Sequence, residues 1–304
     1  MAFTRTWDAA YEALPTDNNW GFEIDNYIRQ VIVDVRERMS VEHEWKNGEN
    51  DGIHKRRMTL GHISGLVVSN TAEPDNDISI SAGECSDKTN AKDIVQSSAL
   101  VKQIDAVWAV GTNKGGLFSG TVAASTLYYI YEILRSDTGV VDAYFDTSAT
   151  AENIPANYDY YRMIDWVVTD ADKHIIPFNS IGNGNEIEKW FKARAEVAAT
   201  LAGTSYTVQA TTGFIPSGLV CSALFGAITT TVGAVSIVML SSDGVNAKTV
   251  FGSTVSLNAI GEINELYNSG YASPIFVPIV GDNIYYMVDA NEITLYLRAV
   301  KFWR

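Results

Sequence analysis

Cysteine, histidine and proline are scarce in this chain of 304 residues, which has 2 Cys, 4 His and 7 Pro. Cys85 and Cys221 lie far apart, and neither forms a Cys-x-x-Cys pair. This pattern excludes a disulfide framework of the kind found in small secreted domains, and it excludes the paired cysteines of structural zinc sites. We expect both cysteines to be reduced and to pack as small apolar residues.

Basic residues are also scarce. The chain has 22 Lys and Arg but 36 Asp and Glu, which gives a formal net charge of −14. Sequence-independent binding of nucleic acid and docking on anionic lipid both need clustered basic residues, so we expect neither partner. The first 20 residues lack a basic start followed by a long apolar run, and glycines and threonines interrupt the most apolar region, 220–240. We therefore expect no signal peptide, no membrane insertion and synthesis in a cytoplasm.

Sequence motifs for catalysis are missing as well. There is no Gly-x-Ser-x-Gly elbow, and Lys114 precedes the pair Gly115–Gly116 instead of following a phosphate-binding loop. Acidic residues at 146, 152, 170 and 172 could supply a carboxylate pair, but no spacing singles one out. We predict a non-enzymatic protein with no catalytic residues, no metal site and no cofactor.

A single amphipathic helix is predicted near the N-terminus, over the sequence that begins at Glu23 and ends near Trp45. Apolar residues recur there at steps of three and four, which places them on one helical face. We interpret this stripe as an oligomerisation surface. Its members are Ile24, Ile28, Val31, Ile32, Val35 and Met39.

The stretch 41–55, VEHEWKNGENDGIHK, carries two of the four histidines among several acidic residues. A zinc site needs more ligands at closer spacing than His43 and His54 supply. We interpret the stretch as the packed exit of the helix and the glycine turn that follows it. The residues assigned to this exit are Glu42, His43, Trp45, Asp51, Gly52 and His54.

Short segments rich in Val, Ile, Thr and aromatic residues follow, separated by turn clusters, which is typical of antiparallel sandwiches. The turn 136–139 predicts a hairpin, and we favour a strand over a helix for 186–200. The predicted fold is mainly β, with a short N-terminal helical attachment and oligomerisation region (1–62) and two antiparallel, jelly-roll-like β-sandwich domains (63–184 and 185–304). Tyr158, Tyr160 and Tyr161 are candidates for contact with a glycan.

The helix and its exit contain an ordered set of residues that resembles a segment near the N-terminus of tailed-bacteriophage structural proteins. The matching residues are Ile24, Asp25, Ile28, Arg29, Arg36, Glu37, Arg38, Met39, Glu42, His43, Trp45, Asp51, Gly52, His54 and Lys55. The sequences around 105–120, 133–164 and 173–179 resemble a second phage tail module, and 205–243 is similar to the β-domain that often follows it. Related sequences have a more regular strand where this chain has EILR (132–135).

This resemblance implies a virion component, a tail or neck fibre or minor tail protein, and it carries no catalytic residues to the chain. It also implies a homotrimer whose partners are itself, other tail, neck or portal proteins and, at its distal end, a host surface glycan. Two other functions stay open: a glycan-degrading tailspike, which usually contains a large repetitive catalytic domain, and a standalone lectin-like module.

Overall fold

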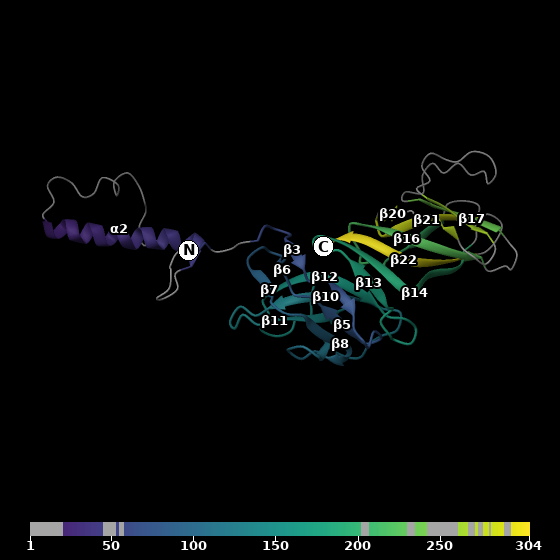
Figure 1. Cartoon of the computed structure of the whole chain (residues 1–304), viewed down its shortest axis with the longest axis horizontal. Helices are drawn as coiled ribbons and strands as arrows, with labels where there is room; N and C mark the ends of the chain where they lie inside the picture. Colours follow the sequence, from purple (N-terminus) through teal and green to yellow (C-terminus); the bar gives the residue numbers. More distant parts are fainter. Residues whose placement is uncertain are drawn as a thin grey trace. The chain divides into compact units, whose positions relative to one another are not determined.

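The computed structural model describes residues 21–44, 53–54, 58–201, 207–229, 235–241, 261–266, 271–272, 276–279, 281–288 and 293–304 (Figure 1). The chain forms two compact units, Met1–Arg57 and Met58–Arg304, which are treated separately below.

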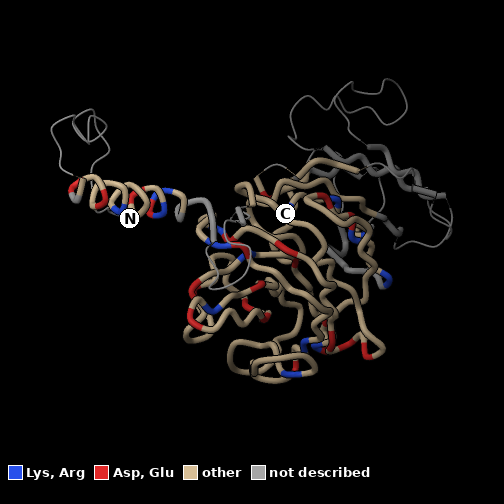
Figure 2. Tube along the Cα trace, turned by 60° about the vertical axis from the view of Figure 1, so that its left-hand side comes forward, with Lys and Arg blue, Asp and Glu red and all other residues tan. Residues whose placement is uncertain are grey.

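The N-terminal unit contains the predicted helix, α2 (Gly21–Glu42). Its apolar residues recur every three or four positions, and an exposed ion pair of 2.9 Å joins Arg29 Nε to Asp25 Oδ2 one turn earlier. Both acidic and basic residues lie along the helix (Figure 2). The helix prediction is confirmed. Two short strands, β1 (His43–Glu44) and β2 (Ile53–His54), follow it and pair antiparallel.

The unit Met58–Arg304 begins with a seven-stranded and a three-stranded sheet. The seven-stranded sheet has the order β12-β10-β11-β9-β8-β5-β4, and the three-stranded sheet has the order β3-β6-β7. The second sheet contacts the first through β7, which lies against β10 and β11. The bounds are β3 (Ile63–Gly65), β4 (Val68–Asn70), β5 (Asp77–Ile80), β6 (Gly83–Ser86), β7 (Asp93–Gln96), β8 (Leu100–Val107), β9 (Lys114–Leu117), β10 (Leu127–Leu134), β11 (Val141–Asp146) and β12 (Tyr160–Val168).

Strands β10 and β11 form the hairpin that the turn 136–139 predicts, with Leu134 opposite Val141. Gly139 adopts φ +72°, a conformation that glycine reaches without steric cost, and its N–H donates to the carbonyl of Arg135. The whole of β10 is buried, which fits its almost continuous apolar sequence. The EILR segment keeps a regular register with β11, and the irregularity lies earlier, between Ile130 and Tyr131 on the side of β12.

Strand β9 departs from the antiparallel prediction, because it runs parallel to both β8 and β11. The loop after β8 turns back so that the N–H of Asn113 donates to the carbonyl of Val101, and the chain then runs forward again as β9. Glycine is needed at 115, since a Cβ there would lie 2.0 Å from the carbonyl oxygen of Val107. Gly115 therefore serves close backbone packing between β8 and β9.

The remaining strands form two five-stranded sheets, with the orders β13-β14-β22-β16-β20 and β15-β21-β17-β18-β19. The sheets contact each other through β16, which lies against β17 and β18. The bounds are β13 (Phe178–Ile181), β14 (Glu186–Leu201), β15 (Thr207–Ala210), β16 (Cys221–Thr229), β17 (Val235–Ser241), β18 (Gly261–Leu266), β19 (Tyr271–Ala272), β20 (Val277–Pro278), β21 (Asn283–Val288) and β22 (Ile293–Trp303). The preference for a strand at 186–200 is confirmed by β14.

The core of this unit is continuous. Trp166 of β12 packs edge-on against Phe302 of β22 with ring centroids 4.3 Å apart, and its indole N–H donates to the carbonyl of Phe214 at 3.1 Å. The predicted boundary at 184/185 falls in the hairpin between β13 and β14, inside one sheet. The mainly β class is confirmed, whereas the division into two jelly-roll-like domains stays a prediction.

Candidate functional site

The six stripe residues of α2 are solvent-exposed in the single chain. Each exposes more than a third of its surface, and Ile28 and Ile32 expose 54% and 61%. Val33 is also exposed, at 50%, but it lies half a helical turn away from Ile24 around the axis. A row of exposed β-branched side chains along one face is a feature that association with another helix would bury.

The helix exit is described only in part. The two-residue ladder of β1 and β2 places His43 opposite His54 and Glu44 opposite Ile53. Trp45, Asp51 and Gly52 lie outside the described residues, as do the side chains of Glu42, His43 and His54. The interpretation of this segment as a packed exit therefore stays a prediction. Among the side chains that the structure does describe, no group of three or more His, Cys, Asp and Glu residues is arranged to hold a metal ion.

The three tyrosines proposed for glycan contact lie in different surroundings. Tyr158 is buried, with its ring edge-on to Trp108 at 5.5 Å between centroids, so its faces are not accessible to a sugar. Burial raises its pKa to about 12. Tyr160 and Tyr161 are half-buried, and Tyr161 lines a groove of about 310 Å³.

The groove combines aromatic rings with basic side chains. Tyr161 lies beside Tyr131 in an edge-on contact, and the ammonium group of Lys88 lies 5.7 Å from the centroid of the Tyr161 ring. Arg162 and Arg304 also line the groove. Tyrosine rings can stack on sugars and basic groups can pair with carboxylates, so the groove has the chemistry to bind an acidic saccharide.

The two arginines of the groove are used differently within the fold. The Arg304 guanidinium donates to the carbonyls of Gly65, Leu66 and Gly184, so its hydrogen-bonding capacity is largely used in joining the chain end to the first sheets. Arg162 has one long contact of 3.5 Å to the carbonyl of Gly61. Lys88 and Arg162 are therefore the cations best able to meet a ligand in the groove.

Buried charged residues are the feature that the sequence patterns missed. Lys102 pairs with Asp142 at 3.0 Å, Lys189 pairs with Asp165 at 2.6 Å, and all four side chains are at most 2% exposed. Glu132 is also fully buried. A signal existed for the acidic residues, because each interrupts an apolar run: LYYIYEIL, VVDAYF and MIDWVV. An acidic residue within such a strand is unusual unless it is paired.

Comparison with family models, curated proteins and solved structures gives no match. The resemblance to phage virion proteins therefore rests on the residues of the helix, its exit and the strands named above. None of the helices that the structure describes is both long and apolar enough to cross a membrane.

Proposed function

We propose that the chain is a non-enzymatic structural component of a phage virion, a homotrimeric fibre protein of the tail or neck. The N-terminal region docks on the tail or portal region, and the C-terminal β-domain faces outward, toward the host receptor. The observation that supports this proposal is the exposed apolar stripe of α2, where Ile28 and Ile32 leave more than half of their surface in water.

The residue types in the stripe favour three helices over two. Ile24, Ile28, Val31 and Val35 follow each other at steps of four, three and four, which are the steps between core positions of a coiled coil. All four are β-branched. β-Branched residues at both kinds of core position shift the preference from dimers toward trimers and tetramers.

The proposal predicts the mass of the particle in solution. The full chain has a mass of 33.3 kDa, so light scattering after size-exclusion chromatography gives about 100 kDa, three times the chain mass, at micromolar concentration. Val35→Lys introduces a charge into the stripe and shifts the particle toward the mass of one chain. A monomeric wild-type chain contradicts the trimer.

A matched control is available on the same helix. Val33 is an exposed valine on the opposite face, so Val33→Lys changes the charge and helix propensity in the same way and leaves the trimer intact. If both lysine variants dissociate equally, the stripe is not the interface. Removal of residues 1–57 leaves the compact unit 58–304, which we expect to fold but not to join virions.

Glycan binding is the second candidate, favoured by the groove beside Tyr161. Calorimetric titration with a uronic-acid oligosaccharide is expected to give saturable binding that Tyr161→Ala abolishes. Tyr160→Ala is the control, because Tyr160 is half-buried on the same strand but does not line the groove. Equal binding by both variants places the contact elsewhere. Binding without virion association would favour a standalone lectin-like module, and turnover of the saccharide would favour a glycan-degrading tailspike.

A further inference from the structure

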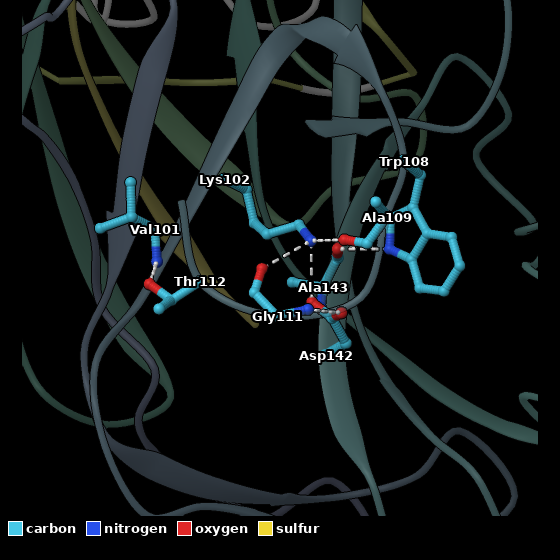
Figure 3. Close-up of polar contacts among 8 residues, drawn as sticks. All are labelled: Val101, Lys102, Trp108, Ala109, Gly111, Thr112, Asp142 and Ala143. Carbon is cyan, nitrogen blue, oxygen red and sulfur yellow. Dashed lines mark hydrogen bonds and ion pairs between the residues drawn. The ribbon is translucent and has the colours of Figure 1, made fainter. Parts of the chain in front are cut away.

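The Lys102–Asp142 pair lies at the centre of a set of short polar contacts with the loop that follows β8 (Figure 3). Lys102 Nζ lies 3.0 Å from Asp142 Oδ1, and the two side chains are 1% and 0% exposed. The same nitrogen donates to the carbonyl of Ala109 at 2.7 Å and approaches that of Gly111 at 3.3 Å. The amine is thus fixed at one orientation beside the carboxyl group.

The carboxyl group of Asp142 is fixed as well. Its Oδ2 accepts the N–H of Gly111 at 2.8 Å, and its Oδ1 accepts the N–H of Ala143 at 2.7 Å (Figure 3). The N–H of Gly111 therefore points at Oδ2, the oxygen on which negative charge develops when a nucleophile adds to the carboxyl carbon and Oδ1 becomes the leaving hydroxyl. Donors fixed in this way stabilise such charge most strongly where water is excluded.

Glu132 is the third buried group. It lies on β10 with its Cα opposite that of Ala143, the residue that follows Asp142. It is 0% exposed, and neither Oε1 nor Oε2 has a hydrogen-bond partner. Burial, with the charge of Asp142 as a further cause, raises the pKa of Glu132 well above its ordinary value, and Lys102 partly offsets this. A buried carboxyl group without a hydrogen-bond partner is unusual. It is explained if the group is protonated and therefore neutral.

Lys102 also departs from the ordinary state of a lysine. Burial lowers the pKa of its ammonium group, although Asp142 and Glu132 act in the opposite direction. Lys102 is buried, and its Nζ is held 3.0 Å from an oxygen of the Asp142 carboxyl group. A desolvated amine with a lowered pKa is one that can act as a nucleophile. Positioning of this kind replaces a slow bimolecular reaction by an intramolecular one.

We propose that Lys102 and Asp142 form an intramolecular amide bond in the folded chain, with Glu132 as the proton carrier. A proton first passes from the ammonium of Lys102 to the carboxylate of Asp142 along their hydrogen bond, which gives a neutral amine and a carboxylic acid. The nitrogen lone pair then attacks Cγ, so that the Nζ–Cγ bond forms. The Cγ–OH bond breaks, and the hydroxyl leaves as water with a proton from Nζ. To accept that proton and return one to the leaving hydroxyl, the Glu132 side chain must turn toward Nζ, because its oxygens make no hydrogen bond in the unlinked pair. Glu132 ends protonated as it began. No oxidant or reductant is needed.

The chain contains its own comparison for this reaction. Lys189 and Asp165 form an equally buried pair with Nζ 2.6 Å from Oδ1. Burial lowers the pKa of Lys189 too, but the groups that act on it are Asp165 and Arg304, with no additional carboxyl group among them. The Lys189 pair therefore has the amine and the carboxylate without the proton carrier, and we expect it to stay unlinked.

Intact-mass spectrometry of the purified, denatured full chain tests the proposal without any substitution. Formation of one amide lowers the mass by about 18 Da, the mass of one water. Proteolysis is expected to release one branched peptide that joins the segments around Lys102 and Asp142. A chain that is folded by circular dichroism and has its full sequence mass overturns the proposal.

Three variants locate the bond. Lys102→Arg keeps the positive charge but cannot form this amide, so it has its full sequence mass; a deficit that persists in this variant overturns the assignment. Glu132→Gln has nearly the same shape but carries no exchangeable acid, and it is expected to lose most of the deficit. Full linkage in that variant excludes Glu132 as the proton carrier. Lys189→Arg keeps the whole deficit of about 18 Da, since that pair is unlinked.

Discussion

Replacement of Lys189 by methionine is predicted to destabilise the unit Met58–Arg304 strongly. Lys189 Nζ is fully buried, lies 2.6 Å from Asp165 Oδ1, and lies 4.1 Å and 4.8 Å from the ring centroids of Phe178 and Trp166. Methionine fills a similar volume but removes the charge and the ammonium donor. It leaves Asp165 in the interior with the N–H of Trp166 as the remaining hydrogen-bond donor that the structure gives it.

The expected magnitude follows from the burial of both partners. Removing one member of a buried ion pair costs about 3–5 kcal/mol, because the other charge stays desolvated and uncompensated. The exposed pair Lys301–Glu186 provides the comparison, with a similar Nζ–Oε1 distance of 2.9 Å but side chains 36% and 48% exposed. Loss of such a surface pair costs at most about 1 kcal/mol, so Lys301→Met is the matched control.

Urea unfolding followed by tryptophan fluorescence measures both variants. We expect the midpoint for Lys189→Met to fall several times further than that for Lys301→Met, with an unchanged slope. The double variant Lys189→Met/Asp165→Leu also removes the carboxylate that is left without its lysine. It is predicted to recover most of the lost free energy of unfolding. Equal midpoint shifts for the two single methionine variants would contradict this expectation, because they would mean that burial of the pair has no energetic consequence.

Three further predictions concern the same unit. Gly115→Ala is expected to lower the free energy of unfolding by about 1–3 kcal/mol or more, because the added methyl group meets a backbone carbonyl of β8. Gly213→Ala is the control, because open space surrounds that position, and it should change the free energy of unfolding in urea by less than about 1 kcal/mol. Since Glu132 has a pKa raised above 4.5, its folded form keeps a proton that the unfolded form releases, so its contribution to stability is full below pH 4.5 and is lost as the pH rises toward the folded pKa. Urea midpoints of wild type and Glu132→Gln, measured from pH 5 to 8, should therefore shift in favour of the variant with rising pH, and parallel profiles would contradict this. Burial raises the pKa of Cys85 and Cys221 to about 12, so neither thiol should react with an aromatic disulfide reagent at pH 8 until urea unfolds the chain. Rapid labelling of the native chain would contradict their burial.

Patterns that are local in sequence predicted the local structure well. The helical stripe that begins at Ile24 became α2, the turn at 136–139 became the β10–β11 hairpin, and 186–200 became part of β14. In each case the spacing of apolar residues and the turn chemistry act within a few residues, so they can be read from the chain alone.

Features that depend on residues far apart in sequence could not be predicted. The parallel course of β9 depends on a loop that folds back to Val101 and on Gly115, which lets β9 approach the backbone of β8. In the sequence alone, this glycine is part of a loop pattern with no assigned role. The ion pairs join Lys102 to Asp142 and Lys189 to Asp165 across separate strands. A strand pattern shows that an acidic residue is out of place in an apolar run, but it does not show which lysine meets it.

The groove beside Tyr161 was outside the reach of sequence reasoning for the same reason. Its lining residues come from β10 and β12, from the loops that follow β6 and β11, from the loop before β16 and from Arg304. The run of tyrosines suggested a surface for sugars, yet alternation and packing place Tyr158 in the core and Tyr161 at the groove. The sequence alone does not show that Tyr158 is buried while Tyr161 lines the groove.

Immunogold labelling of purified virions tests the central proposal most directly, with an antibody raised against the unit Met58–Arg304. We expect gold particles at the tail or neck of the virion, and their loss when a chain without residues 1–57 replaces the full chain. Virions that carry no label, from cells in which the full chain is produced and folded, would contradict a structural role in the particle.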